Sequence, residues 1–221
     1  MLNPAPPAPD RTASPARTTS ALAAALLGLF VVASATRLAA IPPELDWLIR
    51  GSTFLLMPSL AAWVLARRGP LLVVVALLFS ACGDILLGHD DLFIAGMGSF
   101  ALAHVCYVTY FLRSGARPRW YVAACYAVAL AGLIVWLWPG LGDLRIPVAV
   151  YAVLLTGTAV CSSGAGWWTG IGGGLFFVSD SFIAAFDLAE KPEPPLPSMW
   201  IMTTYIAAQV LLASGALRRT R

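Results

Sequence analysis

Charged side chains are scarce in this sequence. Only 11% of the 221 residues are Asp, Glu, Lys or Arg, whereas a soluble protein carries about a quarter. The 14 basic residues are dispersed along the chain and leave a net charge of only +3, which excludes nucleic acid as a main partner. Hydrophobic residues make up 59% of the chain, so the composition predicts an integral membrane protein.

Residues that bind metals or form disulfides are also few. Two histidines, His89 and His104, are too few for a histidine-rich metal site, and the four cysteines show no C-x-x-C spacing. A G-x-G-x-x-G after a strand and a Walker lysine are both missing. We therefore expect no metal and no cofactor. The cysteines stand within apolar runs and are interpreted as small core residues; they are Cys82, Cys106, Cys125 and Cys161.

Long apolar runs account for most of the chain. A helix needs about 20 mostly apolar residues to cross the hydrocarbon layer, and runs of that kind predict eight spans. The period-two alternation of barrel strands is missing, so the predicted fold class is an all-α, polytopic membrane bundle. The expected spans are 18–36, 46–66, 70–88, 92–112, 118–138, 145–162, 167–186 and 198–217.

The two ends of the chain differ from this membrane domain of residues 18–217. Residues 1–17 are rich in Pro and contain two Arg, a composition that cannot build a packed core, and we expect a disordered cytoplasmic tail. Residues 218–221 form a short basic end. The apolar stretch 21–32 followed by Ala33-Ser34-Ala35 also resembles a signal peptide, so cleavage there is the alternative to a first span.

The basic residues predict an orientation in the membrane. With the amino terminus in the cytoplasm, the inside segments hold ten basic residues and the outside segments hold four, which favours an N-in, C-in protein of a bacterial-type plasma membrane. The four outside residues are Arg37, Arg50, Arg145 and Lys191.

Two acidic residues, Asp84 and Asp180, are the only ones of 11 that fall in the interior of predicted spans. A lone carboxylate in hydrocarbon costs about 3 kcal/mol or more, so each is a candidate functional residue, with a structural carboxyl group as the alternative. Each follows a small residue late in an odd-numbered span, which predicts a similar depth in the outer half of the membrane. This similarity suggests two parallel four-helix halves, unless it arises by chance.

Polar side chains follow each aspartate in the next span. His104 and Tyr107 are spaced i, i+3, and Tyr205 and Gln209 are spaced i, i+4, so each pair shares a helix face. Together with the aspartates they predict a polar pocket open to the outer leaflet. The alternatives are a buried histidine with satisfied hydrogen bonds and tyrosines that only pack.

Glycines gather in the first half of the seventh predicted span. The stretch 170–174 contains four of them, including a G-x-x-x-G spacing that allows helices to approach closely. We interpret these glycines as packing residues.

The motifs around the aspartates form a larger pattern. SACGDILL at 80–87 precedes a G-x-x-x-F-x-x-x-H-x-x-Y motif that ends at Tyr107, and FVSDS at 177–181 precedes Y-x-x-x-Q at 205–209. Over roughly residues 18–217 the chain resembles the YhhN-type lysoplasmalogenase family. This resemblance implies about eight spans and hydrolysis of the vinyl ether bond of lysoplasmalogens, with a lysophospholipid as the substrate. The products would be a fatty aldehyde and glycerophospho-ethanolamine or glycerophospho-choline.

The resemblance also implies roles for particular residues. Asp84 and Asp180 match the family's paired acids, whereas Arg50 with Pro58 fits its span-two motif only approximately and would contact the substrate phosphate. The residues implied to position substrate and water are His104, Tyr107, Tyr151, Tyr205 and Gln209.

A pair of carboxyl groups suits this chemistry. A vinyl ether is hydrolysed by protonation of its β-carbon, and water then captures the oxocarbenium ion. The first step needs an acid that keeps its proton near neutral pH, and burial favours the protonated form of a carboxyl group. A second, ionised carboxylate can stabilise the cation and position the water. We expect Asp84 and Asp180 to divide these roles, in either order.

Three other functions use similar residues. A proton-coupled transporter would employ buried Asp and His as a relay. An intramembrane aspartyl protease also has two membrane aspartates, but Ala81 replaces the first Gly of its G-x-G-D motif and Ser179 precedes the second Asp. A non-catalytic lipid-binding protein would keep the pocket without turnover.

Overall fold

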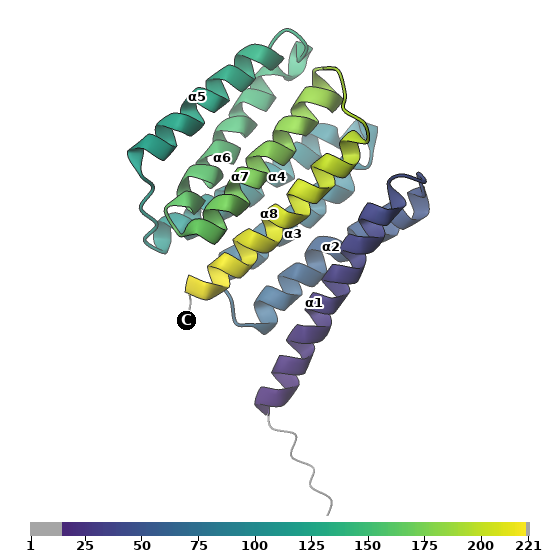
Figure 1. Ribbon diagram of the computed structural model, residues 1–221, viewed down its shortest axis with the longest axis vertical. Helices are drawn as coiled ribbons and strands as arrows, with labels where there is room; N and C mark the ends of the chain where they lie inside the picture. The colour runs from purple at the N-terminus through teal and green to yellow at the C-terminus, as the bar shows by residue number, and fades with distance from the viewer. Residues whose placement is uncertain (1–14, 220–221) are drawn as a thin grey trace, which may run out of the picture.

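Eight long helices joined by short loops form the described part of the chain, residues 15–219 of a computed structural model (Figure 1). No strand occurs among these residues. Three short turns connect helices: η1 (Asp90–Leu92), η2 (Gly142–Leu144) and the π-helical η3 (Ala184–Leu188). The long helices are α1 (Pro15–Ala40), α2 (Asp46–Ala66), α3 (Leu71–Leu87), α4 (Phe93–Arg113), α5 (Trp120–Leu137), α6 (Arg145–Ser163), α7 (Trp167–Ile183) and α8 (Pro197–Arg219).

Seven of these helices are long and apolar enough to cross a membrane, and the protein is an integral membrane protein. The predicted all-α membrane bundle is thereby confirmed. The remaining helix, α3, has 17 residues because it begins after Pro70 and ends before Gly88. Its length of roughly 26 Å falls a little short of a hydrocarbon layer of about 30 Å.

The first helix begins at Pro15, before the predicted start of the first span. Residues 15–17, which we expected to be part of the tail, therefore belong to α1. The rest of the predicted tail, residues 1–14, and the last two residues of the basic end, 220–221, lie outside the described residues.

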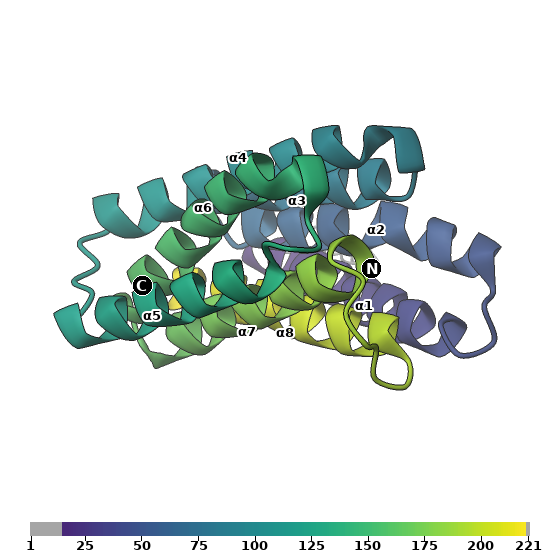
Figure 2. The ribbon, with the colours of Figure 1, turned by 90° about the horizontal axis from the view of Figure 1, so that it is seen from above.

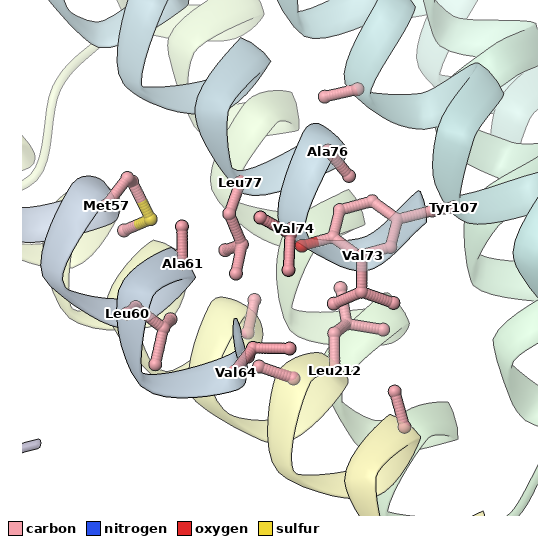
Figure 3. Close-up of a cluster of buried hydrophobic side chains, with 14 of the residues drawn as sticks. Met57, Leu60, Ala61, Val64, Val73, Val74, Ala76, Leu77, Tyr107 and Leu212 are labelled. Carbon is pink, nitrogen blue, oxygen red and sulfur yellow. The ribbon is translucent and has the colours of Figure 1, made fainter. Parts of the chain in front are cut away.

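Apolar side chains from α2, α3, α4 and α8 form the main core (Figure 3). Met57 and Leu60 of α2 meet Leu77 of α3 and Leu212 of α8, and all four are fully buried. Because lipid is as apolar as these side chains, close packing rather than water exclusion holds such a cluster together. In contrast, α5 lies outside the core next to α6 (Figure 2) and buries only Leu137.

The glycines of α7 allow close contacts with two neighbouring helices. A Cβ atom added at Gly173 would lie 2.9 Å from the Cα atom of Ala159 in α6, and one added at Gly172 would lie 3.0 Å from the carbonyl oxygen of Ala208 in α8. The chain therefore approaches α6 and α8 through these two glycines, in the packing role that the sequence predicts.

The interpretation of all four cysteines as core residues is wrong. Cys161 is buried and Cys106 is partly buried, but Cys82 and Cys125 are exposed on the outside of the bundle. An apolar run of residues places some side chains toward the surrounding lipid, where a thiol is tolerated as a small apolar group.

The helices pack in the same order in both halves of the chain. Within each half, consecutive helices contact one another, and between the halves α4 contacts α6 while α2 contacts α8. A parallel four-helix repeat would give this arrangement, and the repeat itself stays a prediction.

Candidate active site

Asp84 and Asp180 line one cavity of about 400 Å³. Asp84 lies in the last turn of α3, and Asp180 lies near the end of α7, so both helices deliver their carboxyl groups at the same end of the bundle. Asp180 is buried and Asp84 is partly buried.

Six helices contribute to the walls of this cavity. Besides the two aspartates, α1 supplies Arg37, α2 supplies Asp46 and Arg50, and the ring of Phe100 comes from α4. Tyr205 and Met202 of α8 complete the lining. A second, apolar cavity of about 40 Å³ adjoins the first and shares Phe100 and Asp180 with it.

Asp180 ends a chain of hydrogen bonds that runs through three helices. The hydroxyl of Tyr151 donates to the Oδ2 atom of Asp180. The Nε2 atom of His104 lies 3.1 Å from the Tyr151 hydroxyl and 3.7 Å from Asp180 Oδ2, while its Nδ1 atom lies 3.1 Å from the hydroxyl of Thr158. Both ring nitrogens of His104 therefore have a polar partner, and these contacts hold the ring in one orientation.

Asp84 has a corresponding partner on α8. The hydroxyl of Tyr205 donates to Asp84 Oδ2 at 2.9 Å. Each aspartate is thus hydrogen-bonded by a tyrosine from another helix, Tyr205 for Asp84 and Tyr151 for Asp180.

A second layer of buried polar groups supports Asp84. The Tyr107 hydroxyl donates to Gln209 Oε1 at 2.6 Å, and Gln209 Nε2 donates to the Ser80 hydroxyl at 3.0 Å. Ser80 lies one turn before Asp84 on α3. These bonds connect α3, α4 and α8 one turn before Asp84.

The structure brings the residues expected at the site into one region, in two layers. Asp84, Asp180, Arg50 and Tyr205 line the main cavity, and Tyr151 lines the adjoining one. Three other expected residues, His104, Tyr107 and Gln209, are completely buried. They contact the cavity-lining groups or the helices that carry them, and are absent from the cavity walls that the structure describes.

Sequence reasoning missed several members of this region. Arg37 was assigned to an outside segment, although its position as the only charged residue from 18 to 43 could have drawn attention to it. Ser80 and Thr158 carry no such signal, because serine and threonine in helices usually bond to a carbonyl of their own helix. Among residues 15–219, no three His, Cys, Asp or Glu side chains gather as a metal site.

Comparison with known proteins places this arrangement in a family. The chain matches the model of the YhhN family over residues 45–216. It belongs to the YhhN family. The resemblance seen in the motifs is confirmed. Of the site residues described in this section, only Arg37 lies outside the YhhN match.

Similar proteins in this family are named lysoplasmalogenases. The lysoplasmalogenase of Mycobacterium bovis is 40% identical over 156 residues, which cover 65% of this chain and 59% of that protein. Human lysoplasmalogenase TMEM86B is 35% identical over 160 residues, which cover 71% of this chain and 69% of the human protein. Bovine lysoplasmalogenase TMEM86A is 37% identical over 160 residues, which cover 66% of this chain and 65% of the bovine protein. The chain thus spans about three fifths of the mycobacterial relative, and no solved structure matches it.

Proposed function

We propose that this protein is a membrane enzyme that hydrolyses the vinyl ether bond of lysoplasmalogen-like lysophospholipids. The observation that carries the proposal is that the two carboxyl groups embedded in the bundle line one cavity, each with a tyrosine hydroxyl bonded to it. The names of the relatives in the YhhN family agree with this activity.

The reaction consumes one water and needs an acid and a carboxylate. The acid transfers its proton to the β-carbon of the vinyl ether, and the α-carbon becomes an oxocarbenium ion. Water adds to that carbon and gives a proton to the carboxyl pair, which restores the proton that the acid donated and yields a hemiacetal. The hemiacetal then breaks its bond to the glycerol oxygen, and a fatty aldehyde and a glycerophospho-alcohol leave.

The hydrogen bonds favour one assignment of the two roles. Donors stabilise the ionised form of a carboxyl group, and Asp180 both accepts from Tyr151 and lies 3.7 Å from His104. Asp84 accepts only from Tyr205 among the described side chains and is the more exposed to the cavity. Asp84 is then the proton donor, and Asp180 is the carboxylate that stabilises the cation and orients water.

The depth of the cavity suits a lysophospholipid. Its mouth lies at the end of the bundle opposite the one where α1 starts and α8 ends (Figure 1). In the N-in, C-in orientation, this mouth faces the outer leaflet. The vinyl ether, which lies just beneath the headgroup, then meets the aspartates, and Arg50 at the mouth contacts the phosphate. The adjoining apolar cavity receives the first carbons of the alkenyl chain.

Purified protein in detergent micelles tests this function. We expect release of free aldehyde from 1-alkenyl-lysophospholipids with ethanolamine or choline headgroups, without any ion gradient. A proton-coupled transporter would release none in micelles and would accumulate its substrate only in vesicles with a proton gradient. Absence of aldehyde with every headgroup offered would contradict the hydrolase.

A further inference from the structure

Arg37 lines the cavity and carries a buried nitrogen that has no hydrogen-bond partner among the described residues. It lies in the last turn of α1, and its guanidinium reaches the cavity that holds Asp84. Its Nε atom is buried and has no hydrogen-bond partner among residues 15–219. An unpaired donor on a buried cation is costly, so this position favours an anion that is brought by a ligand.

No neighbouring carboxyl group among the described residues forms an ion pair with Arg37. Asp84 attracts Arg37, but no ion pair within 4 Å joins them in the part of the chain described. Asp46 lies one turn from Arg50 on α2, but no ion pair within 4 Å joins these two either among the described residues. Of the two arginines at the cavity, Arg37 is the more buried.

We propose that Arg37 binds the phosphate of the lysophospholipid and thereby sets the specificity of the site for phosphorylated substrates. The inference rests on the proposed function for the identity of that phosphate. A guanidinium presents two parallel N–H donors to a phosphate and stays charged in a partly buried position, which suits this task better than an ammonium group does.

Binding at Arg37 would align the substrate with the acid. The glycerol backbone separates the phosphate from the vinyl ether, so a phosphate at Arg37 places the reacting carbons deeper, toward Asp84 and Asp180. Helix α1, which lies outside the stretch matched by the family, then contributes directly to the site.

A binding experiment tests the proposal without turnover. Its probes are 1-alkyl-lysophosphatidylethanolamine, whose saturated ether is not a substrate, and 1-alkylglycerol, which lacks the phosphate. We expect Arg37→Gln to weaken binding of the phosphorylated probe by about 10- to 100-fold and to leave the dissociation constant of 1-alkylglycerol unchanged. Arg37→Lys retains part of the affinity, and Arg119→Gln, an exposed arginine at the other end of the bundle, has no effect.

The outcomes separate this inference from the proposed function. An equal effect of Arg37→Gln on both probes, or no effect on either, overturns the phosphate role of Arg37. Loss of affinity only for the phosphorylated probe, in a protein that releases no aldehyde from any 1-alkenyl lipid, supports the phosphate site and rejects the hydrolase. With an active enzyme, the same variant raises KM for 1-alkenyl-lysophospholipid.

Discussion

At the scale of single residues, a tyrosine hydroxyl bonded to each aspartate is the most specific feature of the site. Tyr151 and Tyr205 come from α6 and α8, and each donates its proton to a carboxyl group of another helix. Such a donor fixes the direction of the carboxyl group and biases its charge.

Removing either hydroxyl tests this role. We expect Tyr151→Phe and Tyr205→Phe to lower kcat by about 10-fold or more, because each variant keeps the ring and loses one hydrogen bond to a carboxyl group. Aldehyde release from 1-alkenyl-lysophospholipid measures the effect. Tyr121→Phe, an exposed tyrosine on α5, serves as the control. Unchanged kcat in both site variants would show that the hydroxyl groups only pack.

The central residues of the site could be predicted from the sequence, but part of their surroundings could not. Asp84 and Asp180 were recognised because carboxyl groups are expensive in hydrocarbon. Arg37 was missed because an arginine near the end of an apolar run is usually a residue that reaches out to the membrane surface. Thr158 could not be found at all, since only the fold brings it to His104.

At the scale of helices, contacts made through glycine decide how closely α7 approaches its neighbours. A methyl group at Gly173 would press on the backbone of α6, whereas one at Gly132 of α5 would meet no atom within 4 Å. Both residues are helical, so their helix propensities change in the same direction on substitution by alanine.

Gly173 and Gly132 provide a matched test of helix packing. We expect Gly173→Ala to lower the thermal unfolding midpoint in micelles by several degrees, because overpacking costs about 1–3 kcal/mol. Gly132→Ala should leave the midpoint unchanged or raise it slightly. Equal midpoints for the two variants would contradict the close contact between α6 and α7.

The ends of the helices were harder to predict than their existence. Pro70 and Gly88 bound α3 as the sequence suggests, but α7 leaves regular helical geometry after Ile183 and continues as the π-helical η3. No proline or glycine marks that change, because it depends on how the segment packs between α5 and α6 residues such as Leu137 and Val148.

At the scale of the whole molecule, the bundle carries Asp84 and Asp180 at the same end. By the positive-inside rule, we expect that end to face away from the cytoplasm. We therefore expect an epitope tag added after Arg221 to be labelled in permeabilised cells and not in intact ones. Labelling in intact cells would reverse the orientation and place the cavity mouth in the inner leaflet.

The central claim is that Asp84 and Asp180 together transfer a proton and stabilise the cation during vinyl ether hydrolysis. Its most direct test is aldehyde release by Asp84→Asn and Asp180→Asn, measured beside binding of the 1-alkyl-lysophospholipid probe. Because asparagine keeps the shape and cannot supply the acid or the carboxylate, we expect each variant to lose at least about 100-fold in kcat while it still binds the probe. Asp143→Asn, at an exposed aspartate in η2, should remain fully active. Near-normal turnover in either site variant would contradict the account.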